Sequence, residues 1–303
     1  MQSSKTKSSE SGGKRAENNL ARHNAPSEAA GLYIVATPIG NARDITLRGL
    51  DVLGSCDLIA AEDTRVTAKL MAIYGISKPL TPYNDHNAAR ERPRLLARVA
   101  GGARLALVSD AGTPLISDPG YKLVREALAK GLSVHAIPGP SAALTALTLA
   151  GLPTNRFLFA GFLPSKQGER RRTLEEVRGV AASLIFFEAG RRIAEALADM
   201  HSVLGDRDVA VARELTKLHE EVRRGSLGSL ASEFATQPPP KGEITVVVAP
   251  PIASAPDVGR ADALLEKALA YMPLSAAADL ISTALDFPKR AVYERALSLK
   301  TKL

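Results

Sequence analysis

Short apolar runs alternate with stretches of helical apolar spacing along most of this chain, from residue 32 onward. Eight apolar runs are predicted to be strands: 32–36, 57–61, 104–108, 132–137, 156–160, 183–187, 207–212 and 243–249. Eight other stretches are predicted to be helices, near 46–54, 64–74, 87–100, 119–130, 141–150, 170–181, 190–203 and 227–236. Gly131 and Gly205 are expected to end two of these helices. Strands that alternate with helices are typical of an α/β fold with largely parallel sheets.

Breaks in this alternation divide the chain into segments. We expect four: a disordered tail over 1–30, an N-terminal α/β domain over 31–147, a C-terminal α/β domain over 152–250 and a small helical module over 257–303. Gly and Pro at 151–153 mark the hinge between the two α/β domains. A proline-rich linker from 250 to 256 precedes the last segment, whose three short helical patterns are typical of a helix-turn-helix module.

Composition limits the classes of protein to which the chain can belong. No apolar run approaches the roughly 20 residues of a membrane helix, and the N-terminal residues lack the apolar region of a secretory signal, so we expect a cytoplasmic protein. Cys56 is the only cysteine and the five histidines form no local cluster, which predicts no disulfide and no catalytic metal. The net charge of +7, most of it outside the tail, is compatible with a nucleic-acid partner or with a mildly basic soluble surface.

Three Gly/Pro-rich loops each follow the end of a predicted strand. They span 37–41, 109–114 and 138–142. Open α/β sheets bind ligands at the carboxyl ends of their strands, and Gly and Pro there let the backbone approach a ligand in a fixed shape. The three loops therefore predict a ligand-binding cleft.

The commonest ligands of such a cleft lack their sequence signatures here. No G-x-G-x-x-G follows the first strand and no phosphate-binding P-loop is present, so a dinucleotide or nucleotide is not expected. Zinc-protease and serine-hydrolase motifs are also missing. Within the loops, Asp110 can accept hydrogen bonds from an amine or a ribose hydroxyl. Asp118 and Ser141 are predicted to be helix N-caps, ligand contacts or both.

The order of the motifs adds a resemblance to a known family. The chain has, in sequence, TPIGN, DIT, AEDTR, SDAGTPLISDPG, PGPSA, GFLP, RELTKLHEE and KGE. This series resembles the ribosomal RNA small subunit methyltransferase I family, of the tetrapyrrole-methylase fold class. The resemblance covers about 31–300. It implies a homodimer of chains with two α/β domains, S-adenosylmethionine in the cleft between these domains, and 2′-O-methylation of a cytidine ribose in 16S rRNA of the small subunit.

The resemblance also implies cofactor-binding residues, which belong to the three loops and to the segment that closes the pocket from the second domain. They are Thr37, Pro38, Ile39, Gly40, Asp110, Ala111, Gly112, Thr113, Ser117, Pro140, Ser141, Ala142, Gly161, Phe162 and Leu163. Two segments depart from the family pattern. Only the His-Asn core of a His-Glu-His-Asn-Glu-like stretch is kept at 83–88, and near 190 the usual His and Pro are lost while Glu188 and Arg192 remain.

A ribose hydroxyl needs a group that takes its proton, because it is a poor nucleophile while protonated. Glu62 and Asp63 end the second predicted strand, and we expect one of them to assist the hydroxyl while Arg65 orients a phosphate or ribose. The alternative is that the acidic pair caps the next helix and pairs with Arg65. His86 is the other candidate base, since the pKa of an ordinary imidazole suits proton transfer.

Several basic clusters could contact an RNA backbone. They comprise Lys166, Arg170, Arg171, Arg172, Arg191, Arg192, Arg213 and Lys217, with Lys289 and Arg290 in the helical module. Aromatic residues make up 4% of the chain and tryptophan is absent, so extensive base stacking is not expected. The expected partner is 16S rRNA or the 30S subunit. Two alternatives stay open: a tetrapyrrole C-methyltransferase of the same fold, and a non-catalytic RNA-binding assembly factor.

Overall fold

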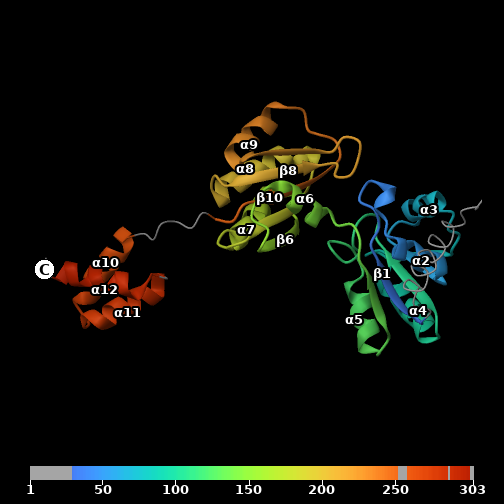
Figure 1. The fold of residues 1–303 in the computed structure, drawn as a ribbon, viewed down its shortest axis with the longest axis horizontal. Helices are drawn as coiled ribbons and strands as arrows, with labels where there is room; N and C mark the ends of the chain where they lie inside the picture. Colours follow the sequence, from blue (N-terminus) through green and yellow to red (C-terminus); the bar gives the residue numbers. More distant parts are fainter. Residues whose placement is uncertain (1–28, 252–257, 286, 301–303) are drawn as a thin grey trace, which may run out of the picture. The chain divides into compact units, whose positions relative to one another are not determined.

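The computed structural model describes residues 29–251, 258–285 and 287–300 (Figure 1). The chain divides between Pro250 and Pro251 into two compact units, an α/β unit and a C-terminal helical unit. The tail predicted over 1–30 lies outside the described residues except for its last two positions. Most of the predicted linker, 252–256, lies outside them as well.

The first sheet of the α/β unit is parallel throughout and has the strand order β3-β2-β4-β1-β5. Its strands are β1 (Gly31–Val35), β2 (Leu58–Ala61), β3 (Leu80–Pro82), β4 (Arg104–Val108) and β5 (Val134–Ile137). Its helices are α2 (Leu47–Ser55), α3 (Thr64–Ile73), α4 (Ala88–Ala100) and α5 (Tyr121–Ala129). Successive strand residues point to opposite faces. Accordingly Tyr33 packs in one apolar cluster with α2 and α3, whereas Leu32 packs in another with α4 and α5.

The second sheet has the order β6-β7-β10-β8-β9. Its strands are β6 (Phe157–Phe162), β7 (Ser183–Ala189), β8 (Asp208–Arg213), β9 (Glu221–Ser226) and β10 (Glu243–Val248). The expectation of largely parallel pairing is wrong here, because only β6 and β7 pair in parallel. Helical crossovers do leave β6, β7 and β8 running in one direction. However, β10 inserts between β7 and β8 in the opposite direction, and β9 joins β8 through a short connection.

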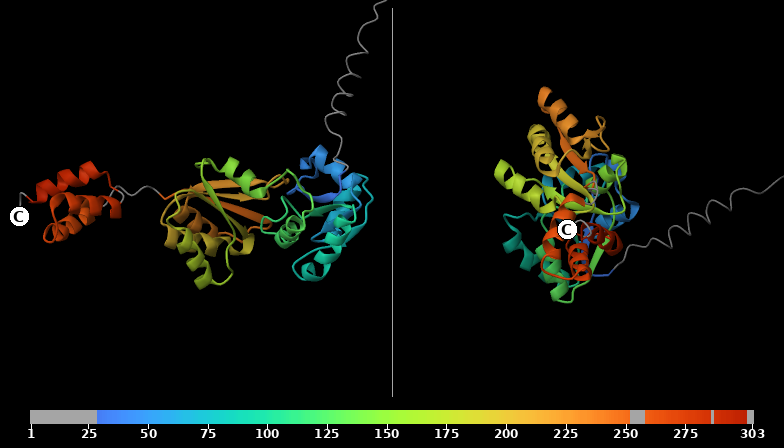
Figure 2. Two further views of the ribbon diagram at one scale, coloured as in Figure 1. Left: turned by 90° about the horizontal axis from the view of Figure 1, so that it is seen from below. Right: turned by 90° about the vertical axis from the view of Figure 1, so that its left-hand side faces the viewer.

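Helices cover both faces of the second sheet (Figure 2). One face carries α7 (Gln167–Val177), α8 (Ile193–Leu204) and α9 (Leu227–Thr236), and the other carries α6 (Ala142–Ala150). Helix α6 therefore packs on the second sheet, although the predicted boundary at 147 assigned most of it to the first domain. The helix is apolar on several sides, which is typical of a helix enclosed between layers. Its packing extends to Ile39 of the first domain, so one cluster joins the two domains.

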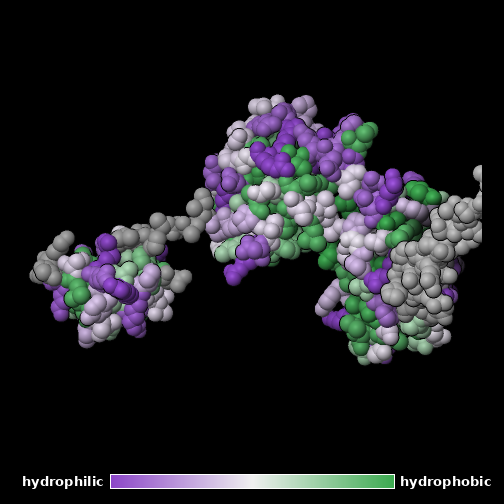
Figure 3. All heavy atoms as spheres, in the orientation of Figure 1, coloured by the Kyte–Doolittle hydropathy of each residue, from purple (hydrophilic) through white to green (hydrophobic). Residues whose placement is uncertain are grey.

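The C-terminal unit consists of α10 (Val258–Leu269), α11 (Leu274–Leu285) and α12 (Lys289–Lys300). Ala261, Leu265, Ala277, Ile281 and Val292 belong to its own buried cluster. The predicted helical module is thus confirmed over its described residues. On the face drawn in Figure 3, hydrophilic and hydrophobic residues are interspersed over each unit. Among the described residues, none of the helices combines the length and the apolar character needed to span a bilayer.

Candidate active site

The predicted convergence of the three loops is found in the structure. The amide of Thr37 donates to the carbonyl of Gly112 over 2.8 Å, and the amide of Gly112 donates back over 3.0 Å. The hydroxyl of Thr113 donates to the carbonyl of Pro140 over 3.1 Å. Gly112 has a φ of +77°, which is the left-handed region that favours glycine. The loops therefore form one hydrogen-bonded rim at the carboxyl ends of the parallel strands.

A cavity of about 360 Å³ lies beside this rim, between the two α/β domains. Of the residues predicted to bind a cofactor, those on its wall are Ile39, Asp110, Ala111, Gly112, Thr113, Ser117, Ser141, Ala142 and Phe162. The second domain contributes further residues that the sequence did not single out for binding, namely Phe187, Ala212, Leu215, Ile244 and Thr245. Phe187, Ala212, Ile244 and Thr245 lie near the ends of β7, β8 and β10, and Leu215 lies in the loop that follows β8. The register of the second sheet, rather than any motif, places them here.

The remaining predicted cofactor residues lie beside the cavity rather than on its wall. Thr37, Pro38 and Gly40 line a second cavity of about 310 Å³, which shares Ile39, Asp110, Ala111 and Glu243 with the first. Leu163 is a buried member of the apolar core of the second domain. Pro140 contributes its carbonyl to the rim. At Gly161, with a φ of +70°, an added Cβ would lie 3.3 Å from the hydroxyl oxygen of Ser117, so the two domains approach closely there.

The loop after Thr113 carries backbone strain at the cavity. Leu115 and Ser117 have φ values of +74° and +67°, which side chains other than glycine adopt at an energetic cost. Ser117 and Asp118 lie on the cavity wall as a result of this path. The prediction that Asp118 caps the next helix is wrong, because the chain enters α5 through Gly120. Ser141 does hold the N-cap position of α6, but its side chain makes no capping hydrogen bond.

The cavity wall is rich in acidic groups. Five carboxylates lie on it, those of Glu62, Asp110, Asp118, Glu188 and Glu243, and its lining residues include no Lys, Arg or His. Burial, followed by the nearby charge of Glu62, raises the pKa of Asp118 to about 6. Burial also raises the pKa values of Glu62 and Asp110. An arrangement of this kind favours a ligand with positive charge.

Asp63 and Arg65 lie outside the wall of this cavity. Asp63 is the N-cap of α3: its Oδ1 accepts from the amide of Arg65 over 2.8 Å, and its Oδ2 lies 2.6 Å from the Arg65 guanidinium. Hydrogen bonds from Arg65 hold the pKa of Asp63 at about 2. The guanidinium side chain of Arg65 is 86% exposed. The structure thus supports the capping alternative for this pair and leaves Glu62 as the member that faces the cavity.

His86 is exposed in the loop between β3 and α4 and is not among the residues on the cavity wall. The neighbouring Asn84 reaches the site more closely, because its side-chain amide donates to the carbonyl of Glu62 over 3.4 Å. Asn87 fixes this loop by accepting from the amide of Asn84 and donating to the carbonyl of Pro82. The loop therefore supports the backbone at Glu62.

The basic residues predicted to contact RNA fall into two groups. The side chains of Lys166, Arg171, Arg172 and Arg191 are exposed, although Lys166 also pairs with Glu169 and Arg171 with Asp199. By contrast Arg170 is 1% exposed and pairs with Asp199, so the expectation that it grips a phosphate at the surface is wrong. Arg192 is half-buried and pairs with Glu188. Arg213 pairs with Glu221, and Lys217 bridges Glu214 and Glu243.

The segment around Lys217 connects the second domain to the first loop of the rim. The amide of Asn41 donates to the hydroxyl of Thr216 over 3.0 Å, and an added Cβ on Gly40 would lie 2.9 Å from the carbonyl oxygen of Leu215. Glu214 and Thr216 have φ values of +49° and +65°. This strained turn is held by the ion pairs of Lys217 with Glu214 and Glu243, of which Glu243 also lies on the cavity wall.

The model of the tetrapyrrole (corrin/porphyrin) methylases matches residues 31–231, and that of the RsmI C-terminal HTH domain matches 255–300. Among solved structures, a diphthine synthase aligns with a TM-score of 0.57 at 19% identity, covering 72% of this chain and 89% of its own. A uroporphyrin-III-C-methyltransferase from Thermus thermophilus aligns with a TM-score of 0.52 at 19% identity, covering 72% and 94%. These two likenesses establish the fold.

Curated relatives are much closer in sequence. A protein of Mesorhizobium japonicum named ribosomal RNA small subunit methyltransferase I is 52% identical over 270 residues, which are 89% of this chain and 92% of the relative. A protein of the same name from Escherichia coli O157:H7 is 44% identical over 283 residues, 92% of this chain and 99% of the relative. The expected fold class and family are confirmed, and this chain belongs to the ribosomal RNA small subunit methyltransferase I family, within the tetrapyrrole methylases.

Proposed function

We propose that this chain uses S-adenosylmethionine to methylate the ribose 2′-oxygen of a cytidine in 16S rRNA. Membership of the family supports methyl transfer to small-subunit rRNA. The observation that carries the choice of methyl donor is the acidic cavity between the two α/β domains. Its location at the strand ends is where an open α/β sheet binds its ligand.

The cavity residues fit this donor in charge and in shape. S-adenosylmethionine has a sulfonium and an ammonium group, which the carboxylates of Glu62, Asp110 and Asp118 favour, whereas the phosphates of a dinucleotide would be repelled. The other two carboxylates on the wall, Glu188 and Glu243, are paired with Arg192 and Lys217. Ile39, Phe162 and Leu215 offer apolar surface for a flat base. The residues proposed to hold the donor are the nine predicted cofactor residues that lie on the cavity wall, of which Ile39 is the first in the chain and Phe162 the last. When bound, the donor supplies a methyl group that its positive sulfur already activates.

Glu62 and Asp118 are the proposed proton acceptors for the ribose hydroxyl. Both lie on the cavity wall, and the pKa of each is raised by burial. A carboxylate with a pKa of about 6 is mostly ionised at neutral pH and accepts a proton more readily than an ordinary one. The other contribution of the chain is alignment, since the rim holds its loops in one hydrogen-bonded arrangement.

The RNA is proposed to contact basic side chains outside the acidic cavity. Lys166, Arg171, Arg172 and Arg191 are exposed, and the helical unit has the matched helix-turn-helix character. Phosphate contacts of this kind give an affinity that falls with salt. We further propose that the protein acts in the cytoplasm as a homodimer, with 16S rRNA or the 30S subunit as its partner.

Methyl transfer from a labelled donor tests the proposal. The protein is incubated with labelled S-adenosylmethionine and with either 30S particles or a tetrapyrrole precursor. We expect label in a 2′-O-methylcytidine of 16S rRNA. Label in the tetrapyrrole would instead support the alternative enzyme of this fold, and binding of RNA without any label would support an assembly factor.

Substitution of the proton acceptors tests their role. The hydroxyl gives up one proton, so the one substitution of the two, Glu62→Gln or Asp118→Asn, that removes its acceptor is expected to lower kcat by about 10²–10⁴-fold, the usual contribution of general base catalysis. Asp63→Asn is the matched control, because Asp63 neighbours Glu62 in the chain but lies off the cavity wall. Wild-type turnover in both acceptor variants would reject the assignment.

A further inference from the structure

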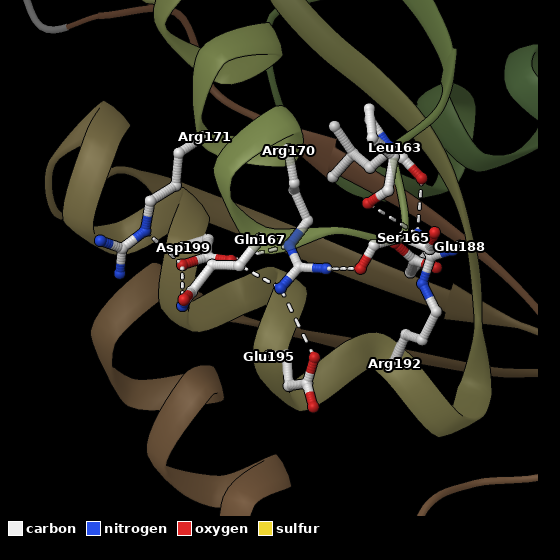
Figure 4. A network of polar contacts seen from close by, with 10 residues as sticks. Leu163, Ser165, Gln167, Arg170, Arg171, Glu188, Arg192, Glu195 and Asp199 are labelled. Carbon is white, nitrogen blue, oxygen red and sulfur yellow. Dashed lines mark hydrogen bonds and ion pairs between the residues drawn. The ribbon is translucent and has the colours of Figure 1, made fainter.

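The segment that follows β6 leads away from the cavity. It has three consecutive backbone carbonyls, those of Leu163, Pro164 and Ser165, which lie between β6 and α7 and so outside any helix or strand. Two arginine side chains donate to all three (Figure 4). Arg192 Nη2 donates to the carbonyl of Leu163 over 2.5 Å and lies 3.4 Å from that of Pro164. Arg170 Nη1 donates to the carbonyl of Ser165 over 3.1 Å. The backbone of this segment is therefore held by side chains that come from α7 and from the start of α8.

Each arginine is in turn held by a buried carboxylate. Arg170 Nε donates to Asp199 Oδ2 over 2.7 Å, and Arg192 Nη2 donates to Glu188 Oε2 over 2.9 Å. Asp199 and Glu188 are almost wholly buried. Burial acts to raise the pKa of Asp199, but hydrogen bonds from Arg171, Arg170 and Gln167 outweigh it and keep the pKa below its usual range. Each buried carboxylate thus neutralises the arginine that it pairs with, and that arginine is less available to bind another anion.

The segment so held carries a wall of the cavity. Phe162 directly precedes Leu163, lies on the cavity wall and is 62% exposed. Its ring meets that of Phe187 edge to face, with centroids 5.4 Å apart. Glu188, which holds Arg192, also lies on the wall. Fixing the carbonyls of 163–165 therefore fixes the position of Phe162 at the cavity.

We infer that Arg170 and Arg192 are positioning residues for the methyl-donor pocket, which hold the segment 163–165 so that Phe162 forms its wall. This inference rests on the proposed function of the cavity. Contact with RNA phosphate is the competing role, since both arginines belong to basic clusters. The geometry disfavours that role most clearly for Arg170, because a phosphate would have to displace Asp199 from Nε and the carbonyl of Ser165 from Nη1. At Arg192 a phosphate would compete at Nη2 with Glu188 and with the carbonyl of Leu163.

The test separates donor binding from RNA binding. Arg170→Lys and Arg192→Lys keep the positive charge. The first loses the planar fork that reaches Asp199 and the carbonyl of Ser165, and the second loses the Nη2 that donates to both Glu188 and the carbonyl of Leu163. We expect each to weaken S-adenosylmethionine binding at least tenfold by calorimetry, while affinity for 30S particles changes less than twofold. Arg172→Gln is the matched control on the same helix. It is expected to leave donor binding unchanged and to weaken RNA binding, because its side chain is exposed.

Hydrogen exchange supplies a readout that does not depend on activity. In each lysine variant the amides of residues 162 and 170 should exchange faster, because they flank the held segment, in β6 and in the first turn of α7, where the amide of residue 170 donates to the carbonyl of Lys166. Those of β8 and β10 should stay at wild-type rates. A variant that loses protection throughout the second domain is destabilised globally, and this result would overturn a local positioning role. Wild-type donor affinity in both variants, with weaker RNA binding, would also overturn the inference in favour of phosphate contact. Failure of the wild-type protein to bind the donor would instead reject the proposed function.

Discussion

At the scale of single residues, Asp118 is the group whose titration most depends on the fold. Its pKa is about 6 in the folded protein, compared with 3.8 for an ordinary aspartate in an unfolded chain. The folded state therefore holds the proton more tightly than the unfolded state. Its contribution to stability is present at low pH and is lost as the pH rises from about 4 to about 6.

Asp118→Asn is expected to remove this pH dependence. Above pH 6 the variant should be more stable than the wild type by about 1 kcal/mol, a value reduced for the partial exposure of the side chain. Near pH 4 the two proteins should differ little, because the wild-type carboxyl is then protonated in the folded state. Urea unfolding of the donor-free proteins at pH 4.5 and 7.5 measures the difference. Equal free energies of unfolding at both pH values would contradict the assigned pKa.

At the scale of elements, the close approach between the first rim loop and the strained turn at 214–217 holds the two α/β domains together. Gly40 has no room for a side chain, because an added Cβ would lie 2.5 Å from Lys217 Cγ and 2.9 Å from the carbonyl oxygen of Leu215. The long side chain of Lys217 can move, but the backbone of Leu215 has less freedom to do so. Leu215 itself lies on the cavity wall, so a shift there alters the site.

Gly40→Ala is accordingly expected to weaken S-adenosylmethionine binding several-fold and to destabilise the α/β unit by about 1–3 kcal/mol, as overpacking does. Gly54→Ala is the control, because Gly54 lies in α2 with nothing within 4 Å of an added Cβ. Alanine there should stabilise the protein by about 0.4–1 kcal/mol through helix propensity and reduced freedom of the unfolded chain. Thermal unfolding and calorimetry measure both effects. Unchanged donor binding in the Gly40 variant would show that the turn does not position the cavity.

At the scale of the whole molecule, the α/β unit and the helical unit have separate apolar cores. Within the described ranges, every residue on the cavity wall belongs to the α/β unit. The affinity for the donor is therefore expected not to depend on the C-terminal helices. The helical unit has exposed basic residues of its own, such as Arg290, whose side chain is 92% exposed and pairs with Glu294 of the same helix.

Truncation after Pro251 tests this independence. The shortened protein should bind S-adenosylmethionine within about twofold of the full chain, since no residue of the cavity is removed. Its affinity for 30S particles should fall, and the slope of log affinity against log salt should become shallower by about 0.7–0.9 for each phosphate contact that is lost. Titrations at three salt concentrations measure both quantities. Loss of donor binding on truncation would mean that the two units are coupled.

The accuracy of the sequence predictions follows from how locally each feature is encoded. The central parallel strands β1, β2 and β4 of the first sheet are short, largely apolar and buried runs, so the sequence predicts each within about two residues of its bounds. The edge strand β5 is predicted equally well, although most of it is only partly buried. Strand β3 is only three residues long, and β9 is a mostly polar edge strand, so neither gives an apolar signal. The candidate site was predicted in outline, because the rim loops follow strand ends. Phe187, Glu188 and Leu215 were not expected on its wall, since no local pattern places them there.

Local sequence is enough to predict most of the elements, the three rim loops and the resemblance to the family, because periodicity and turn chemistry act between near neighbours in the chain. The insertion of β10 between β7 and β8, and the packing of α6 on the second domain, become visible only in the folded chain. The tertiary structure also decides that Arg170 and Arg192 face inward, since their partners Asp199 and Leu163 lie 29 residues away along the chain. Such partners are chosen by packing and strand register, and these depend on the whole fold rather than on local spacing.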